Sequence, residues 1–540
     1  MNKHHPFHPI IYVRGFAATQ GEIEETVADP YMGFNVGSTK ARMVWSGELK
    51  RFYFESPLVR LMSDHKYDDV FVAGEDLLML EKSDRLLDYR CIIIYRYYDE
   101  ASEAFGAGDT PPIQHFGKGL NELILRLRDK ICENPKNEVT PDEFRCYLVA
   151  HSMGGLVCRA FLQGKDNKGN PLGSDETRKC VDKFFTYATP HNGIDLRIVR
   201  NVPGWVTFGD VNNFNRDKIA GYLDLPKKSK DVSVVHTFPP ERIFNLVGTN
   251  PSDYRVLGGL SAWAAGDASD GLVRIDDATT HGPSGPDCRD VASPRAFVHR
   301  SHSGHYGIVN SEEGYQNLTR FLFGDIRVDG ILDIDDITLP PVVQEAFNAG
   351  KVVKASYQFE IVVSVRGCQW QMHRRTQREN SAIFRTYDEL FPGKPGEARP
   401  PDRSKSPHLF SVFLDPTKSV APDQAPTADG VDMRPVSFAF DLRVMVPDYE
   451  VDGILFLKKH YEGGFIYREL IVIEAERATP EGPWKIRYGF HKDSPSEPNI
   501  DAVTHPLENE ERGLTFNIPI TQETKPGLTG TLRIEVRPWE

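Results

Sequence analysis

The residue best suited to covalent chemistry in this chain is Ser152, in the stretch VAHSMGG at 149–155. A serine hydroxyl is too weak an acid to attack an ester unaided. It needs a histidine to take its proton and a carboxylate to orient that histidine. The small-x-Ser-x-Gly pattern uses common residues and can arise by chance. The neighbouring elements and the available partners must therefore decide whether Ser152 is a nucleophile.

Two downstream segments offer the partners that such a serine would need. The segment GDASDGLVRI contains Asp267 and Asp270, and Asp270 lies in a glycine-flanked turn. The segment RSHSGHYGIVN places His302 and His305 in a loop between a predicted strand and a predicted helix. The chain order Ser, Asp, His is the one expected for a nucleophile on a strand–turn–helix bend. Either aspartate and either histidine fits this order.

The elements around Ser152 favour a nucleophile over a structural helix cap, which is the alternative interpretation. An apolar strand is predicted over 143–150, and a helix follows over 154–164. A serine on such a bend adopts strained backbone angles, and the small residues Ala150 and Gly154 leave room for them. The bend lifts the hydroxyl off the sheet edge, and the helix N-terminus behind it favours developing negative charge.

The first 325 residues alternate short apolar runs with helical periods. This pattern predicts an α/β domain over 1–325, with a mainly parallel sheet covered by helices on both faces. The predicted strands are 9–15, 90–98, 143–150, 179–190, 241–250 and 295–301, and the predicted helices are 116–131, 154–164 and 311–324.

Two long pieces, 17–85 and 194–240, exceed what a minimal sheet requires. Long insertions in a compact domain are usually lids or caps over a site. We favour a lid for 194–240, which contains the apolar stretch 202–208. For 17–85, a lid and a surface decoration are equally good interpretations.

The pattern changes after about residue 330. Period-2 alternation is clearest in VSFAFDLRVMV, and turn-rich loops separate several such segments. This is typical of an antiparallel β-sandwich, which we predict over 346–540. Residues 326–345 are predicted to be a linker between the two domains.

Several motifs together resemble the α/β-hydrolase superfamily of the lipase or esterase type, including its GPI-inositol-deacylase-like branch. HSMGG resembles the nucleophile turn, ATPHNG the TPHxG stretch, SDGLV the acid turn, SGHYGIVN the histidine loop and IIYVRGFA the first glycine turn. The chain departs from this pattern at Ala150, where glycine is common, and at Arg14, where histidine is common. The resemblance covers 1–325 and does not extend to the β domain.

The resemblance implies a role for each catalytic residue. Ser152 would be the nucleophile, and Asp270, which matches DGLV, would orient the base. His305 would be that base, and later the acid, because it directly precedes YGIVN; His302 is its rival. Asp267 competes with Asp270 for the role of the acid.

The same resemblance implies the supporting groups of the site. The oxyanion hole would consist of the backbone N–H groups of Met153 and Phe16. His151 and His191 would support the site by hydrogen bonding. Arg14 would hold the glycine turn or meet an anionic group, and the sequence does not choose between these roles.

Composition narrows the class of protein. The formal net charge of −13 argues against a dedicated nucleic-acid binder. The seven cysteines are scattered without metal-binding spacing, and we expect no metal and no cofactor. The N-terminal segment lacks a signal peptide's apolar core, and no apolar run reaches about 18 residues. These features favour a cytoplasmic protein, with export by a route without a cleaved signal left open.

The sequence therefore favours a serine hydrolase that cleaves carboxylic esters, with a lipid-like acyl ester as substrate. The same triad would serve an amidase, a thioesterase or an acyltransferase. A non-catalytic scaffold with a binding β-sandwich is a further alternative. The β-sandwich could contact a membrane surface or a partner protein, or it could brace the first domain. The sequence leaves the oligomeric state and the acyl group open.

Overall fold

A computed structural model describes most of the chain, and its contacts divide the chain into two compact units. The first comprises residues 1–295 and 299–322, and the second comprises 296–298 and 323–540. The described residues are 3–15, 20–43, 46–70, 82, 85–104, 106, 111–194, 215–251, 269–284, 290–303, 307–394, 396–415, 436–452, 458–477, 484–491, 499–502 and 514–539.

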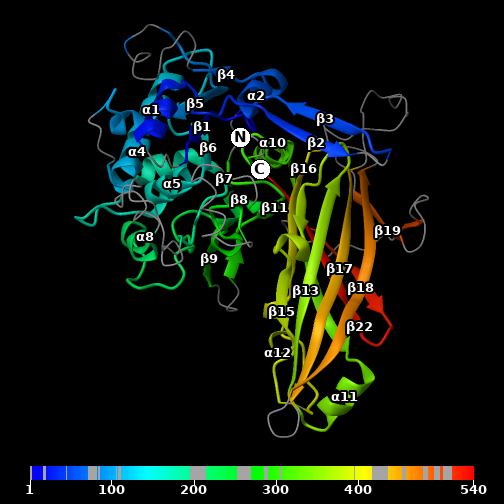
Figure 1. The fold of residues 1–540 in the computed structure, drawn as a ribbon. Coiled ribbons are helices and arrows are strands. Elements are labelled where there is room, and N and C mark those ends of the chain that lie inside the picture. Colours follow the sequence, from blue (N-terminus) through cyan, green and yellow to red (C-terminus); the bar gives the residue numbers. More distant parts are fainter. Residues whose placement is uncertain are drawn as a thin grey trace, which may run out of the picture. The chain divides into compact units, whose positions relative to one another are not determined.

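A seven-stranded sheet is the centre of the first unit (Figure 1). Its strands follow the order β11-β8-β7-β6-β1-β5-β4. Their bounds are β1 Ile10–Val13, β4 Asp68–Asp69, β5 Cys91–Tyr95, β6 Cys146–His151, β7 Val181–Tyr187, β8 Ile243–Gly248 and β11 Arg295–Val298. Two short hairpins accompany the sheet: β2 Ser38–Met43 with β3 Leu49–Phe54, and β9 His281–Ser284 with β10 Asp290–Ala292.

Parallel pairing aligns the carboxyl ends of the central strands. β1 lies between β5 and β6, and Val13 at its end is opposite Ala150 of β6. Ala150 is in turn opposite Thr186 of β7. The chain therefore leaves β1, β6 and β7 at the same edge of the sheet, and this edge gathers the loops that follow them.

Helices cover both faces of this sheet. In α4 (Ile113–Cys132), the predicted apolar stripe that includes Leu120 and Ile124 is fully buried, and α4 packs against α5 (Met153–Gln163). Neighbouring residues of a strand point to opposite faces. Phe184 belongs to the core beneath α4 and α5, whereas Phe185 contacts Phe321 of α10 (Glu312–Phe323). The remaining helices are α1 Gln20–Ala28, α2 Pro57–His65, α6 Asp175–Cys180 and α8 Arg216–Tyr222.

The structure describes much of the predicted insertion 17–85 but not the apolar stretch of the insertion 194–240. The segment 17–85 is not a single appendage, because it contains α1, the β2–β3 hairpin, α2 and also β4, a strand of the main sheet. The apolar stretch 202–208, on which the lid prediction for 194–240 rests, lies outside the described residues. That prediction stays a prediction.

Two antiparallel sheets form the second unit. One has the order β16-β12-β22-β21, and the other has β14-β13-β17-β18-β19-β20 with β15 paired to β13. The strands are β12 Ile326–Thr338, β13 Val353–Val365, β14 His373–Arg375, β15 Ile383–Thr386, β16 His408–Leu414, β17 Val436–Asp452, β18 Lys458–Arg477, β19 Trp484–His491, β20 Asn499–Ala502, β21 Leu514–Gln522 and β22 Gly527–Pro538. Two helices, α11 Pro341–Asn348 and α12 Tyr387–Leu390, accompany them.

The predicted linker over 326–345 is wrong. Most of it is β12, which pairs with β16 on one side and with β22 on the other. The acidic residues of this segment are partly accommodated inside the sheet. The buried Asp329 accepts hydrogen bonds from Arg327 and from Ser411, so its charge is compensated within the fold.

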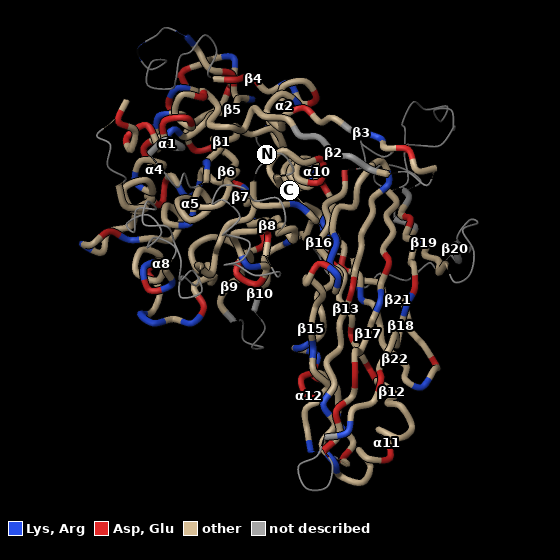
Figure 2. Tube along the Cα trace, viewed as in Figure 1, with Lys and Arg blue, Asp and Glu red and all other residues tan. Residues whose placement is uncertain are grey.

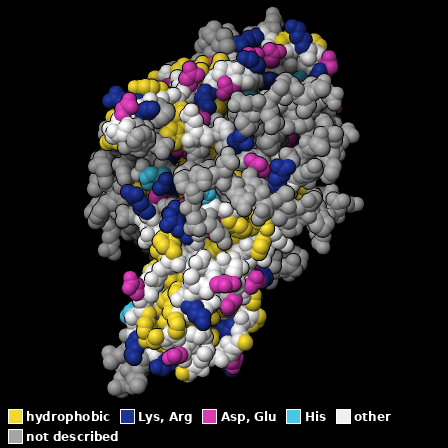
Figure 3. All heavy atoms as spheres, turned by 90° about the vertical axis from the view of Figure 1, so that its right-hand side faces the viewer, with side chains coloured by type: hydrophobic (Ala, Val, Ile, Leu, Met, Phe, Trp, Pro, Cys, Tyr) yellow, Lys and Arg dark blue, Asp and Glu magenta, His cyan; other side chains and the backbone are white. Residues whose placement is uncertain are grey.

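The two sheets of the β domain share one hydrophobic core, which includes Leu332 of β12 and Phe440 of β17. Buried and part-exposed residues alternate along β17 as predicted, and Figure 2 shows charged positions along the strands of this unit. Some large apolar side chains such as Phe384 and Phe465 are exposed, and Figure 3 shows hydrophobic side chains among charged ones on the surface. The predicted fold class, a parallel α/β sheet followed by an antiparallel β domain, is confirmed.

No helix in the described part of the chain combines the length and the apolar character needed to cross a bilayer.

Candidate active site

Ser152 lies on a sharp bend between β6 and α5. Its φ of 52° and ψ of −125° fall in a region that residues with a side chain rarely adopt. Such a conformation costs free energy and persists only where the surrounding structure enforces it. Here the Ser152 amide donates a hydrogen bond to the carbonyl oxygen of Tyr187 at 2.9 Å, which fixes the bend against β7. The predicted strand–turn–helix bend is confirmed.

The glycines around the bend are required by close contacts. A Cβ atom at Gly154 would lie 2.3 Å from the carbonyl oxygen of Val13 in β1. A Cβ atom at Gly155 would lie 2.1 Å from Oγ1 of Thr189. A Cβ atom at Gly15, in the turn after β1, would lie 2.7 Å from Cβ of Ser152. The small residues of two separate motifs thus let the β1 turn and α5 approach the serine.

A continuous chain of hydrogen bonds links Ser152, His302 and Asp270. Nε2 of His302 lies 2.9 Å from Oγ of Ser152, and Nδ1 lies 2.9 Å from Oδ2 of Asp270. Because a carboxylate only accepts, Nδ1 carries the proton and donates to Asp270, which leaves Nε2 to accept from the serine hydroxyl. All three residues are nearly inaccessible to solvent, at 1%, 2% and 1% exposure.

Backbone donors hold the Asp270 carboxylate in place. Its Oδ1 accepts hydrogen bonds from the amides of Leu272 at 3.0 Å and Val273 at 2.7 Å. The intervening Gly271 has a φ of 100°, which closes this turn without strain. Oδ2 is thereby directed to the imidazole. Gly248, at the end of β8, allows close approach, because a Cβ atom there would lie 2.8 Å from Cβ of Asp270.

The loop that carries His302 is fixed by backbone contacts. The His302 amide donates to the carbonyl oxygen of Asp270 at 2.9 Å. The His302 carbonyl accepts from Nε2 of His151 at 2.9 Å, and the two imidazole rings are 4.9 Å apart. Burial, followed by the nearby His302, lowers the pKa of His151 well below its usual value. His151 is therefore neutral, and it donates a hydrogen bond to the His302 carbonyl oxygen without carrying charge.

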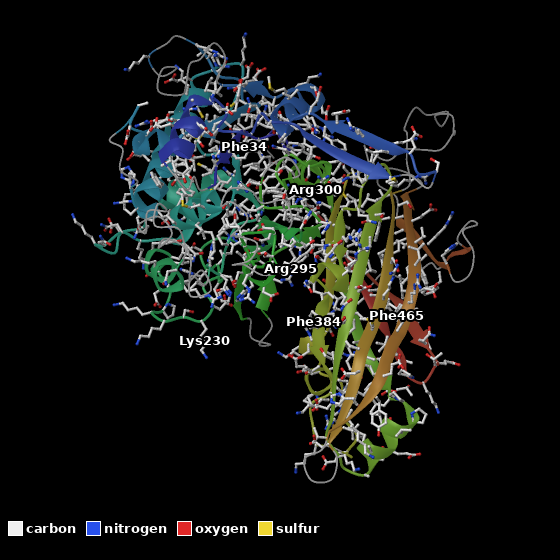
Figure 4. All side chains as sticks on the ribbon, viewed as in Figure 1. Phe34, Lys230, Arg295, Arg300, Phe384 and Phe465 are labelled. Atoms are coloured by element: carbon white, nitrogen blue, oxygen red, sulfur yellow. The ribbon has the colours of Figure 1, made fainter. Side chains whose placement is uncertain are left out.

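A buried ion pair anchors the same loop two residues earlier. Arg300, labelled in Figure 4, donates from Nη2 to Oε2 of Glu313 at 2.7 Å, and both side chains are buried. The Arg300 carbonyl oxygen accepts from the amide of Asn250 at 3.2 Å. The pair thus ties the His302 loop to α10. It was not predicted, although RSHS and the SEEG start of the helix contain both charges.

The assignment of the histidine needs correction. The sequence favours His305 as the base, but the imidazole that joins Ser152 to Asp270 belongs to His302, the rival candidate. His305 lies outside the described residues, as does Asp267, the rival acid. A resemblance between loops ranks such neighbours by sequence spacing alone, whereas the path of the loop decides which ring reaches the serine.

The predicted oxyanion donors are described only in part. Met153 is the first residue of α5, and the amides of a helix's first turn have no acceptor within the helix. The Met153 amide is therefore available beside Oγ of Ser152. Phe16 lies outside the described residues.

His191 supports a neighbouring loop. Its carbonyl oxygen accepts from Nη1 of the fully buried Arg159 at 2.9 Å, and Arg159 also donates to the carbonyls of Val232 and Val234. Sequence reasoning missed Arg159, although an arginine in the otherwise apolar helix GGLVCRAFLQ is a usable signal.

The described residues contain no group of three or more His, Cys, Asp or Glu side chains arranged to hold a metal ion. Nδ1 of the buried His8 hydrogen-bonds with the Tyr89 hydroxyl at 2.9 Å, which gives this histidine a structural role.

No protein-family model and no curated protein sequence matches the chain. Two solved structures are similar. One is the mature lipase BlEst2 of Bacillus licheniformis, at 14% identity over 59% of this chain and 91% of that chain, with a TM-score of 0.29. The other is the phospholipase PlaB of Legionella pneumophila in complex with thio-NAD, at 14% identity over 84% and 89%, with a TM-score of 0.25. At these TM-scores the similarities carry no argument about chemistry. The chain's own strand order shows a parallel α/β sheet with a serine bend between β6 and α5, followed by an antiparallel β domain.

Proposed function

We propose that this protein is a serine hydrolase that cleaves carboxylic esters through an acyl-enzyme. The observation that carries the proposal is the hydrogen-bonded chain from Ser152 through His302 to Asp270, with the serine in a strained backbone conformation. A serine that served only as a helix cap would accept a hydrogen bond from the first turn of α5. Ser152 makes no such bond and instead directs its hydroxyl to His302.

In the acylation step, Oγ of Ser152 attacks the ester carbonyl carbon while its proton moves to Nε2 of His302. The tetrahedral intermediate then collapses, the carbon–oxygen bond to the leaving group breaks, and His302 gives its proton to the departing alkoxide. Water repeats the sequence on the acyl-enzyme and releases the carboxylic acid. Asp270 keeps Nδ1 protonated and stabilises the imidazolium formed in each step.

The negative charge of the tetrahedral intermediate needs donors beside the nucleophile. We assign one to the backbone N–H of Met153 at the start of α5, where the helix dipole adds favourable potential. The second donor of the proposal is the backbone N–H of Phe16, the residue after Gly15. The tight contact between Gly15 and Ser152 supports this assignment, since it brings that turn to the nucleophile.

The test of the proposal is Ser152→Ala in the full-length chain, assayed on short- and long-chain acyl esters. We expect turnover to fall at least about a thousandfold, because removal of a triad serine costs more than that in comparable enzymes. A fluorophosphonate probe should label the wild-type protein on the peptide that contains Ser152 and leave the variant unlabelled. Stronger turnover of long-chain esters would extend the proposal to lipid-like substrates.

The matched control is Ser63→Ala, which removes an exposed serine hydroxyl in α2. It should keep wild-type labelling and turnover. Undiminished ester hydrolysis by the Ser152 variant, with a folded circular-dichroism spectrum, would remove Ser152 as the nucleophile.

A further inference from the structure

Arg14 occupies a position next to the catalytic turn. It follows the last residue of β1 and directly precedes Gly15. A Cβ atom at Gly15 would lie 2.7 Å from Cβ of Ser152 and 2.9 Å from Nδ1 of His151. The Arg14 carbonyl oxygen faces the nucleophile bend, because a Cβ atom at Gly154 would lie 2.4 Å from it. The Tyr97 hydroxyl donates to the same carbonyl at 2.7 Å and fixes the backbone. The Arg14 side chain therefore starts from a rigid point beside the site.

The guanidinium of Arg14 is only partly used by the fold. Nη1 donates to the carbonyl oxygen of Met32 at 2.5 Å. Within the described residues, no carboxylate forms an ion pair with Arg14, and Nε and Nη2 have no hydrogen-bond partner. The side chain is half-buried, so its charge is partly withdrawn from water without a counter-charge. Withdrawing such a cation from water costs free energy unless an anion compensates its charge.

Several other half-buried or buried arginines of the first unit have their charge compensated. Arg60 pairs with Glu312, and Arg300 pairs with Glu313. Arg96 pairs with Asp99 and also donates to three backbone carbonyls. These three arginines are thus satisfied by carboxylates, and Arg96 by several carbonyls as well. Among the described residues, Arg14 has one neutral acceptor and no carboxylate partner.

The field of this charge reaches the catalytic machinery. After burial and the nearby His302, the Arg14 charge is a further cause that lowers the pKa of His151. The His151 ring in turn lies 4.9 Å from that of His302. The Arg14 charge therefore lies near His151, whose ring neighbours the imidazole that contacts Ser152.

We propose that the Arg14 guanidinium binds an anionic group of the substrate, a carboxylate or a phosphate, next to the scissile ester. Two N–H donors in a planar fork match the oxygens of either group. The inference rests on the proposed function, since it selects among esters that Ser152 would cleave. The competing interpretation is that Arg14 only holds the 29–34 loop through Met32, and the test separates the two.

The experiment compares matched esters that differ only by an anionic group. One pair carries the difference in the acyl part: p-nitrophenyl pentanoate and the mono-p-nitrophenyl ester of glutarate. The other carries it in the alcohol part: monobutyryl glycerol and the same ester with a phosphate on the glycerol. For each pair the readout is the ratio of kcat/KM, anionic over neutral, in wild type and in Arg14→Gln. A change in one pair shows which part of the substrate bears the anion.

We expect the ratio to fall about tenfold or more in at least one pair, as for the loss of one charge-assisted hydrogen bond. The matched control is Arg96→Gln, which weakens the same loop through the carbonyls of Val27, Asp29 and Pro30. Its ratios should stay within about twofold of wild type, which is the scatter expected for a site without direct contact. Ratios that are unchanged in Arg14→Gln, or that fall equally in both variants, overturn the proposal.

A second measurement varies the salt concentration. In the wild type, the ratio should fall as sodium chloride rises from about 0.05 M to about 0.5 M, because an accessible charge pair is screened. The wild-type ratio should also exceed that of Arg14→Lys, since lysine keeps the charge but loses the planar pair of N–H donors. A salt-independent ratio speaks against binding of an anion.

If the wild type cleaves none of the four esters and resists the fluorophosphonate probe, the proposed function itself fails. Neutral-ester turnover without charge selectivity overturns only the role of Arg14.

Discussion

At the scale of single residues, the site depends on one strained serine and on how its neighbours hold it. The positive φ of Ser152 is tolerated because Gly15, Gly154 and Gly155 allow three segments to close around it. The strain has a direct consequence, since it turns the hydroxyl away from the start of α5 and toward His302. The glycines of the motif are thus part of the catalytic geometry.

A prediction at this scale concerns the histidine. His302→Asn should lower kcat by about a thousandfold or more, because the serine loses the base that accepts its proton. His305→Asn, three residues later in the same loop, should lower it by less than about tenfold, as expected for a residue outside the proton-transfer chain. Single-turnover kinetics on a p-nitrophenyl ester would measure both. The reverse order of effects would restore His305 as the base.

At the scale of elements, the parallel sheet brings distant motifs to one edge. The turn after β1 and the bend after β6 touch because their strands pair directly, with Val13 opposite Ala150. The acid turn follows β8 at some distance in sequence, and the His302 loop reaches it through the hydrogen bond between the His302 amide and the Asp270 carbonyl. The buried Arg300–Glu313 pair ties that loop to α10. The site is therefore assembled by the sheet and then fixed by loop contacts.

A prediction at this scale concerns helix α5. Gly155→Ala should destabilise the protein by about 1–3 kcal/mol, because the new methyl would overlap Thr189, a buried side chain with little room to move. Activity should fall as well, since any shift of α5 moves Ser152. Urea unfolding followed by tryptophan fluorescence would measure the change.

The control for this variant is Gly221→Ala in α8. A Cβ atom there meets nothing within 4 Å, and alanine favours a helix over glycine by about 1 kcal/mol. This variant should be neutral or slightly stabilised. Equal effects of the two substitutions would show that helix propensity, and not the contact with Thr189, governs position 155.

At the scale of the whole molecule, the two units have separate hydrophobic cores. Ser152, His302 and Asp270 all lie within the first unit. The first unit also buries several histidines in neutral form, which gives its stability a pH dependence. Burial, followed by nearby His5 and Lys183, lowers the pKa of His8 to about 3. Burial lowers the pKa of His151 and of His191 well below the usual value.

A prediction at this scale follows from these three histidines. Each titrates near pH 6.5 in the unfolded chain and far lower in the folded one. As pH falls below about 6.5, the unfolded state binds protons that the folded state refuses, so the free energy of unfolding decreases. The decrease approaches about 1.4 kcal/mol per pH unit for each histidine.

Urea unfolding between pH 7.5 and pH 5.5 measures the effect. Carboxyl groups with lowered pKa values change the free energy of unfolding only at lower pH. His8→Gln, which removes one of the three groups, should flatten the slope. An unchanged slope in this variant would contradict a neutral, buried His8.

Much of the architecture was predictable, because it depends on periodicity and chain order. Alternation along β17 and the apolar stripe of α4 are local patterns that the fold confirms. The strand β12 within the predicted linker 326–345 was not predictable in this way, because its charges are compensated only in the folded sheet. Asp329 bonds to Arg327 and Ser411, and Asp333 pairs with Arg533. Residues 195–214 and 252–268 lie outside the described residues, so the lid and Asp267 remain untested.

The sequence by itself determined the nucleophile bend and the order of its partners. A strand, a serine among small residues and a helix are contiguous in the chain, and each acts on backbone geometry within a few residues. Only the tertiary structure shows which histidine contacts the serine. His302 and His305 share one loop, and the choice between them depends on contacts from Asp270 and His151, which are distant in sequence. Likewise, the sequence shows that Arg14 stands where histidine is common in the resembling glycine turn. Only the structure shows that its charge lacks a carboxylate partner among the described residues.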